Sequence, residues 1–151
     1  MKLDSTDLKR GYVFHANLPT SDKEHACIIV TKVDTIENII SYVYIQSYDT
    51  IDKQNRIDVL MKNDSNALVV LEPKDISFLY SKPHTSCVCC DEKHINSLSV
   101  SCFNSMFSSK QARYAKVNYI PHELWGKINE GIDNSDTLDD EDKEYLLSED
   151  H

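Results

Sequence analysis

The sequence predicts a mostly β protein of the α+β class, in which a small barrel is followed by a C-terminal helix and an acidic tail. Short runs of β-branched and aromatic residues, separated by polar turns, occupy much of residues 10–90. An amphipathic stripe after Pro121 predicts a helix, and acidic residues are concentrated beyond it. A chain of 151 residues fits one domain with a modest core.

Five to seven short strands are expected between residues 10 and 90. Residues 11–18 are rich in β formers and stop at Pro19. The run at 26–31 is apolar throughout, which is typical of a central strand buried on both faces. Residues 39–47 form the third strong strand. Further short strands are expected at 56–61, 67–71 and 86–90, with the polar segment 62–66 as a turn.

The helix is expected to begin at Pro121, because the missing N–H of proline costs nothing at the first helical position. Gly131 is the expected stop signal. Between them, four apolar residues recur at helical spacing and form one stripe that would pack on the barrel: Leu124, Trp125, Ile128 and Ile132.

The formal net charge of −9 comes from the end of the chain. Residues 129–151 contain ten acidic residues and one lysine, whereas the 15 acids and 15 bases of residues 1–128 cancel. A neutral body has no overall basic field that would attract nucleic acid over a long range. Residues 133–151 are expected to form an acidic tail that is mobile or ordered by a partner. It is either a solvated extension or a segment that folds over a basic groove and mimics RNA.

Nothing in the sequence predicts secretion or membrane insertion. No run approaches the roughly 18 apolar residues of a membrane helix, and the charged start of the chain lacks the apolar segment of a signal peptide. A cytoplasmic protein is therefore expected. The five cysteines agree with this, because an odd number with three between residues 87 and 90 does not suit a disulfide framework.

Four stretches, in order along residues 9–132, resemble the PemK/MazF family of toxins from toxin–antitoxin systems. Residues 10–14 read Arg-Gly-Tyr-Val-Phe, where the family has R-G-D-I and an apolar residue. Residues 18–20 read Leu-Pro-Thr, which resembles its L-x-P-T turn. Residues 27–31, Cys-Ile-Ile-Val-Thr, match its apolar strand ending in Ser or Thr. Residues 88–95, Val-Cys-Cys-Asp-Glu-Lys-His-Ile, resemble its V-x-C-D-x-x-x-I motif.

The resemblance implies a Src-homology-3-like barrel of the PemK/MazF/CcdB type with its C-terminal helix over residues 1–132, usually as a homodimer. It also implies an endoribonuclease that cleaves single-stranded RNA without a metal or another cofactor, inhibits growth and is neutralised by a cognate antitoxin protein. Two other functions stay open: a catalytically silent barrel that binds a protein or RNA, and a zinc-stabilised interaction module.

Two positions depart from the family pattern. His25 stands where most of these toxins have an arginine before the second long strand, and Cys89 replaces the arginine that precedes the C-D motif. Asp91 matches the family acid, and Ser47 matches its Ser or Thr after the third strand. The resemblance therefore makes His25, Asp91 and Ser47 the candidate catalytic residues.

RNA cleavage without a metal needs a base, an acid, and donors that stabilise the charge on phosphorus. His25 could be the base or the acid and carries positive charge only when protonated, whereas Asp91 could be the base or orient His25. The structural alternatives are a surface histidine, an aspartate that ends a strand and a structural Ser47. The candidate RNA contacts are Arg10, Lys93 and Arg113.

Cysteine and histidine residues also gather between positions 84 and 94. Zinc needs four tetrahedral nitrogen or sulfur ligands, and Cys87 and Cys89 would share one strand face. However, His84 or His94 would have to fold back to complete a site, and the spacing misses the usual finger pattern. A cysteine nucleophile paired with His94 or His25 is the other alternative, although no surrounding signature supports it.

Overall fold

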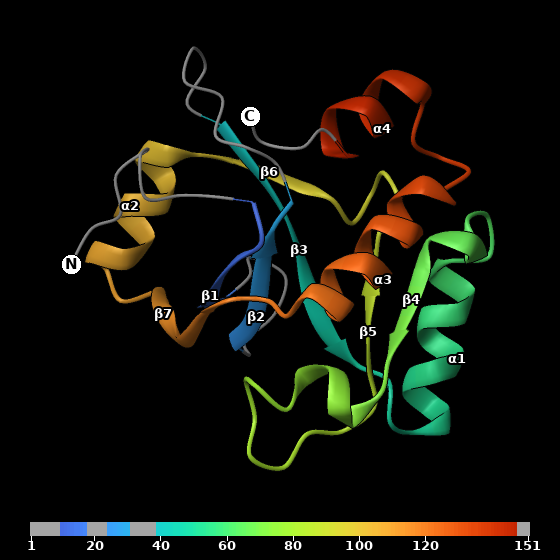
Figure 1. The fold of residues 1–151 in the computed structure, drawn as a ribbon, viewed down its shortest axis with the longest axis horizontal. Coiled ribbons are helices and arrows are strands. Elements are labelled where there is room, and N and C mark those ends of the chain that lie inside the picture. The colour runs from blue at the N-terminus through green and yellow to red at the C-terminus, as the bar shows by residue number, and fades with distance from the viewer. Residues whose placement is uncertain (1–9, 18–23, 31–38, 148–151) are drawn as a thin grey trace.

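The computed structural model describes residues 10–17, 24–30 and 39–147 (Figure 1). These residues form a mixed α+β fold with a seven-stranded antiparallel sheet and four α-helices. In chain order the strands and helices are β1 (Tyr12–Asn17), β2 (Glu24–Ile29), β3 (Ile39–Ser47), α1 (Ile51–Leu60), β4 (Leu68–Leu71), β5 (Ser86–Cys89), β6 (Asn96–Ser99), α2 (Val100–Ser108), β7 (Ala112–Tyr119), α3 (His122–Asp133) and α4 (Asp140–Leu147).

The strands follow the order β4-β5-β3-β2-β1-β7, and β6 pairs with β3. β3 is the central strand, because residues 39–42 pair with β6, residues 42–44 with β2 and residues 45–47 with β5. Among the described strands, β4 and β7 end the path without pairing with each other, so the sheet is open. The expected α+β class is confirmed, whereas closure into a barrel is not shown.

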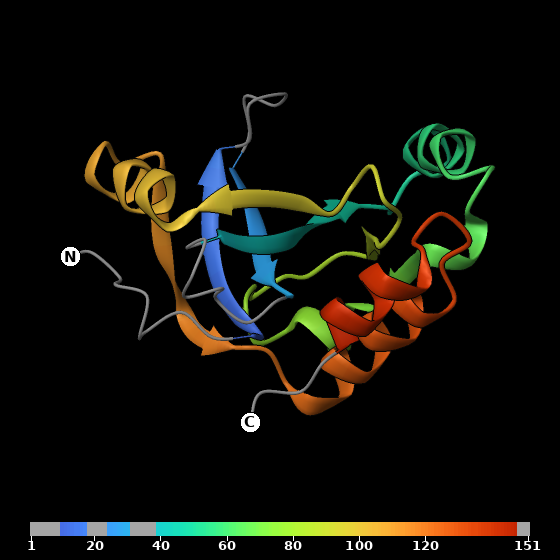
Figure 2. The same cartoon turned by 90° about the horizontal axis from the view of Figure 1, so that it is seen from above.

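Both faces of the sheet carry apolar clusters. Figure 2 shows α3 and α4 together on one side of β4 and α1 on the other, with α2 at the opposite end near β7. One cluster joins the strands to α3 and includes Ile28, Val88 and Ile128, which are all fully buried. The second cluster packs Phe14 of β1 against Phe103 of α2, with ring centroids 4.9 Å apart. The strands β1, β2 and β3 therefore contribute alternate side chains to the two cores.

Most of the strands expected from the sequence are present. The runs expected at 11–18, 26–31, 39–47, 67–71 and 86–90 correspond to β1 to β5 in that order. The expected turn at 62–66 is confirmed, since residues 61–63 form a turn and Ser65–Ala67 a short 3-10 helix. Residues 18–23 and 31, which include the Leu-Pro-Thr motif, lie outside the described residues.

The strand expected at 56–61 is wrong, because this segment belongs to α1. Thr50 caps the helix by accepting a hydrogen bond of 3.2 Å from the Lys53 N–H, and Asp52 lies in the first turn, where its charge favours the helix dipole. Ile57 and Met61 are buried four residues apart, whereas Val59 between them is exposed. The two buried residues thus lie on one helical face, in which residues at i and i+4 are neighbours.

The elements that were not expected from the sequence include β6, α2 and β7. β6 is mostly polar, and it pairs with β3 through a register in which the hydroxyls of Ser41 and Ser97 lie 3.0 Å apart. α2 is rich in serine, which has a modest helix propensity, and it is anchored by the fully buried Phe103. β7 forms an end of the sheet by pairing with β1.

The helix expected after Pro121 is confirmed as α3, with Pro121 at its N-cap. Three of the four stripe residues are buried, and Trp125 is partly buried against the same core. Gly131 is not the stop signal, because the helix continues to Asp133. A Cβ atom at Gly131 would overlap the side chain of Val69, so this glycine allows α3 to approach β4 closely.

The acidic segment packs against the body as far as residue 147. Leu138 and Leu146 of this segment are buried in the α3 core. The guanidinium of Arg10 lies 4.2 Å from the centroid of the Trp125 ring and donates hydrogen bonds to Asn129 and to the carbonyl of Leu146. Arg10 therefore connects the start of β1 to both C-terminal helices. Whether residues 133–151 move as a tail stays a prediction.

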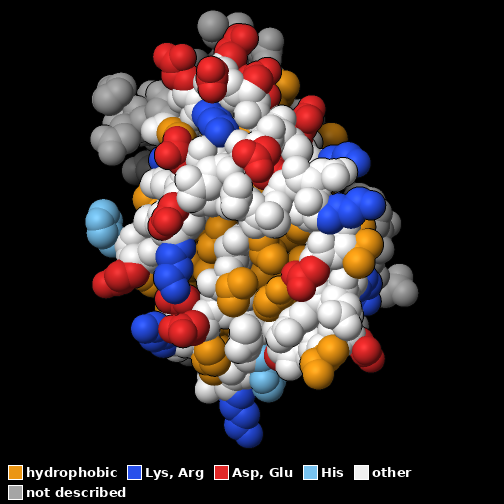
Figure 3. All heavy atoms as spheres, turned by 90° about the vertical axis from the view of Figure 1, so that its right-hand side faces the viewer, with side chains coloured by type: hydrophobic (Ala, Val, Ile, Leu, Met, Phe, Trp, Pro, Cys, Tyr) orange, Lys and Arg blue, Asp and Glu red, His pale blue; other side chains and the backbone are white. Residues whose placement is uncertain are grey.

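Apolar side chains are exposed on α1 and β4, namely Ile51, Val59, Leu60 and Val70. Figure 3 views the right-hand side of Figure 1 and shows apolar side chains gathered in a hollow, with charged groups around it. Within the described part of the chain, none of the helices combines the length and apolar content needed to cross a membrane.

Candidate active site

His25 lies where β2 separates from β3. The β2–β3 ladder ends at the pair formed by Cys27 and Tyr44, and β3 pairs with β5 from Ile45 onward. Beyond this pair the contact between the two strands is made by a side chain: Nδ1 of the His25 imidazole lies 3.1 Å from the carbonyl oxygen of Ile45. Because a carbonyl oxygen can only accept, Nδ1 carries the proton, and Nε2 is the basic nitrogen of the neutral ring.

The separation of these strands opens a cleft of about 220 Å³. Its walls are the start of β2, the end of β3, the start of β5 and residues from the segment 76–84. Two of the three candidate catalytic residues, His25 and Ser47, line it together. The polar side chains of the lining are Glu24, His25, Gln46, Ser47, Tyr80, Lys82, His84 and Ser86.

Asp91 is not part of the cleft lining, and it binds a different histidine. Its side chain is 6% exposed, and Oδ1 lies 2.6 Å from Nδ1 of His94. The N–H groups of His94 and Ile95 both donate to the Asp91 carbonyl, which turns the chain so that His94 faces the carboxylate. The hydrogen bond that His94 donates to Asp91 raises the pKa of His94, because the carboxylate stabilises the protonated ring more than burial disfavours it.

Tyr44 lies between the two histidines. Its ring centroid is 5.4 Å from that of His25 and 6.5 Å from that of His94. Burial, with nearby Cys89 and Asp91, raises the pKa of Tyr44, so its hydroxyl stays protonated at neutral pH. His25 and Asp91 are therefore linked only indirectly: the ring of His25 lies beside Tyr44, Tyr44 lies beside His94, and His94 binds Asp91.

The cations expected to bind phosphate lie in three different places. Arg10 is held by acceptors near α3 and α4, away from the cleft lining. Lys93 is exposed on the loop that carries Asp91 and His94. Arg113 of β7 binds Glu24 at the wall of the cleft, with Nη2 2.7 Å from Oε1. The structure brings Arg113 and Lys93 close to the candidate site but not Arg10.

Three residues of this site were not assigned a catalytic or RNA-binding role from the resemblance: Tyr44, Lys82 and His94. Lys82 lines the cleft itself, but it belongs to an irregular segment with no periodicity that would place it. His94 entered only the zinc and thiol alternatives. The signal that could have identified it is its spacing of three residues from Asp91 after a strand, where a turn brings the two side chains together.

The cysteines do not build a metal site in the part of the chain that is described, where no group of three or more His, Cys, Asp or Glu side chains could hold an ion. All five are free thiols, and four are buried. Hydrogen bonding with Cys87 and burial raise the pKa of Cys89, and burial raises the pKa of Cys27 and of Cys90. A buried, protonated thiol is a poor nucleophile, so histidine chemistry is better supported than cysteine chemistry.

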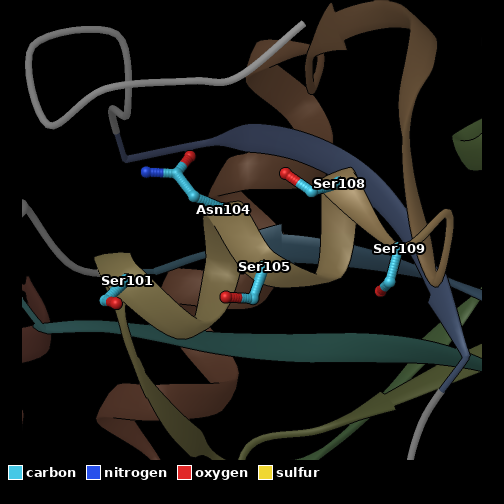
Figure 4. A pocket seen from close by; sticks show the side chains of 5 residues that line it. All are labelled: Ser101, Asn104, Ser105, Ser108 and Ser109. Atoms are coloured by element: carbon cyan, nitrogen blue, oxygen red, sulfur yellow. The ribbon is translucent and has the colours of Figure 1, made fainter.

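A larger cavity, of about 610 Å³, lies along α2. The Oδ1 atom of Asn104 is buried without a hydrogen-bond partner among the described residues. No ionisable side chain lines this cavity, so it cannot supply acid–base chemistry, and the surface around His25 is the better candidate active site. Figure 4 shows its lining residues, Ser101, Asn104, Ser105, Ser108 and Ser109.

Comparisons of the chain with protein-family models, with curated proteins and with solved structures find no significant match. The resemblance to the PemK/MazF toxins therefore depends on the four sequence motifs, and the functional argument depends on the geometry described above.

Proposed function

We propose that this protein is a metal-independent endoribonuclease of the toxin type, which cleaves single-stranded RNA over the surface between His25 and His94. The observation that carries the proposal is the hydrogen bond between Asp91 and His94, because it favours the protonated form of an imidazole next to Tyr44. The proposal includes the further features implied by the PemK/MazF resemblance: a Src-homology-3-like barrel, a cytoplasmic homodimer and a cognate antitoxin.

The two histidines suit different steps of the reaction. Nε2 of neutral His25 can accept the proton of the ribose 2′-hydroxyl, since Nδ1 donates to Ile45. Protonated His94 can give its proton to the departing 5′-oxygen. The bond between the 2′-oxygen and phosphorus forms while the bond from phosphorus to the 5′-oxygen breaks. The products are a 2′,3′-cyclic phosphate and a 5′-hydroxyl, and no metal ion is required.

His94 also supplies positive charge that the sequence lacks at two arginine positions of the family. Because its pKa is raised by Asp91, it stays charged at a higher pH than an ordinary histidine. The protonated Tyr44 hydroxyl is a neutral donor beside it, and Lys82 adds a cation at the cleft. Such groups stabilise the charge that develops on the phosphoryl oxygens, which is usually the largest contribution to catalysis.

The test uses the purified full chain and a random-sequence, single-stranded RNA in the presence of a metal chelator. We expect products that end in a 2′,3′-cyclic phosphate and begin with a 5′-hydroxyl. The matched substrate carries 2′-O-methyl groups and should stay intact, because it has no hydroxyl to deprotonate. Cleavage that requires a divalent metal, or no cleavage of any RNA, would contradict the proposal.

The second candidate is a catalytically silent module that binds a protein partner or RNA. It is favoured by the engagement of Arg10 and Arg113, both expected to meet phosphate, with acceptors inside the protein. The exposed apolar side chains of α1 and β4 are also typical of a protein-binding surface. In this case wild type and the His94→Ala variant should have the same effect on growth when expressed, and neither should cleave RNA.

A further inference from the structure

The side chain of Arg113 reaches across one strand, β1, to contact Glu24. It lies on β7 opposite His15 of β1, while Glu24 lies on β2, on the far side of β1. Its Nε and Nη2 atoms donate to both carboxylate oxygens of Glu24 over 2.7, 3.0 and 3.1 Å. This is a bidentate ion pair, which is the geometry that a guanidinium also uses to bind a phosphate.

The ion pair lies at the wall of the candidate active-site cleft. Glu24 lines the cleft next to His25. Tyr80, another residue of the lining, interacts electrostatically with both Glu24 and Arg113. The side chains of Arg113 and Glu24 are 61% and 38% exposed, so both charges are accessible to a solute. Glu24 lines the cleft itself, and Arg113 contacts the cleft through Glu24.

The effect of this ion pair on the cleft is larger than its effect on folding. Exposed ion pairs contribute little to stability, because water screens them and two long side chains lose conformational freedom. The hydrogen bonds from Arg113 lower the pKa of Glu24, so the carboxylate is charged at neutral pH. It therefore repels a phosphate next to His25 and occupies the two donors of Arg113 that would attract one.

We propose that Glu24 is an internal competitor of RNA: an RNA phosphate that enters the cleft displaces the Glu24 carboxylate and takes its place on the guanidinium of Arg113. This inference rests on the proposed function, because it names a regulatory contact of the same site. Lys82 lines the same cleft, so the bound phosphate would lie near two cations once Glu24 is displaced.

The experiment measures RNA binding without cleavage. The probe is a fluorescent, random-sequence, single-stranded decamer with 2′-O-methyl groups, titrated with the full chain and followed by fluorescence anisotropy. Glu24→Gln should bind about three- to tenfold more tightly than wild type at low salt, and the gain should shrink at high salt. Arg113→Gln should bind more weakly than wild type. In the Arg113→Gln background the gain from Glu24→Gln should be clearly smaller, because Glu24 has no guanidinium left to occupy and only its repulsion of the phosphate is removed.

Glu130→Gln is the matched control, because it removes one negative charge from α3, which does not line the cleft, and it should change affinity less than twofold. If wild type binds the decamer and Glu24→Gln binds no better, the internal competitor is overturned and the proposed function stands. A gain that is equally large in the Arg113→Gln background also overturns it, since it shows that Glu24 acts by repulsion alone and not by occupying Arg113. If no variant binds the decamer, both the inference and the proposed function are overturned.

Discussion

The carboxylate of Asp64 accepts a hydrogen bond of 2.6 Å from the hydroxyl of Ser135, 71 residues further along the chain. Asp64 is buried, and it also accepts from the Asp136 N–H at 2.7 Å and from the Thr137 hydroxyl at 2.7 Å. Thr137 in turn accepts a hydrogen bond from the N–H of Glu92, beside Asp91. Asp64 therefore joins the turn before β4 to the acidic segment and, through Thr137, to the loop of the candidate active site.

Replacing Asp64 with Ala should lower the free energy of unfolding by about 2–4 kcal/mol, because several buried donors would lose a charged acceptor together. Urea denaturation at neutral pH measures this loss. Asp136→Asn is the control, since its side chain is exposed, and it should change stability by less than about 0.5 kcal/mol. Equal stability of the two variants would show that the Asp64 hydrogen bonds do not hold the segment.

The contribution of Asp64 should also depend on pH. Burial alone would raise the pKa of Asp64, but the hydrogen bonds from Asp136, Ser135 and Thr137 more than offset this, and the pKa is lowered. Its stabilisation is therefore present above the unfolded pKa of about 3.9 and is lost as the pH falls through the lower folded value. The difference in unfolding free energy between wild type and Asp64→Asn should shrink in this acidic range. A difference that is constant down to the lowest pH would contradict the lowered pKa.

The pair of Asp91 and His94 should show the opposite pH dependence. Because the folded pKa of His94 is raised, the stabilisation by the ion pair is complete below the unfolded value of about 6.5 and is lost as the pH rises through the raised folded value. NMR titration should find His94 above about 6.5 in wild type and closer to it in Asp91→Asn. An unchanged pKa of His94 in this variant would separate Asp91 from the proposed catalytic role.

Loss of either histidine should impair RNA cleavage. His25→Ala and His94→Ala should each lower the rate by about a hundredfold to ten-thousandfold, which is typical for removing a general base or acid. His25→Arg distinguishes proton transfer from charge, because arginine restores the cation of the family but cannot act as a base at neutral pH. We expect it to be as inactive as His25→Ala. Higher activity than wild type would instead show that the site lacked positive charge.

Two glycines of α3 should respond in opposite directions to alanine. Gly131→Ala should destabilise the protein by about 1–3 kcal/mol, because its Cβ would overlap Val69. Gly126→Ala meets no atom within 4 Å and should stabilise it by about 0.5–1 kcal/mol, since alanine is the better helix former. Thermal unfolding measures both, and Val69→Ala should partly rescue Gly131→Ala. The same sign for both glycines would contradict the close approach of α3 and β4.

The residues of the candidate site could be predicted only where they belong to a recognisable motif or stand at the end of a predicted strand. His25 and Ser47 were identified from the resemblance, and they line one cleft, because both stand at strand ends where β2 and β3 separate. Asp91 was identified too, but its partner is His94 and not His25. Arg10 shows the limit of this reasoning: it was expected to bind RNA, yet its acceptors lie near α3 and α4, which no local pattern indicates.

The sequence by itself determined the elements whose apolar pattern is strong and local. The unbroken run in β2 and the long β-branched segment of β3 predict strands buried on both faces. The stripe of α3 predicts a helix, because burial of one helical face requires a period of about 3.6 residues. The tertiary structure alone decided that residues 51–60 form a helix and that Gly131 serves close packing. It also decided which charges meet, since Glu24 and Arg113 are 89 residues apart in the chain. Such a contact depends on strand order and register, and these follow from how all the apolar faces are buried together.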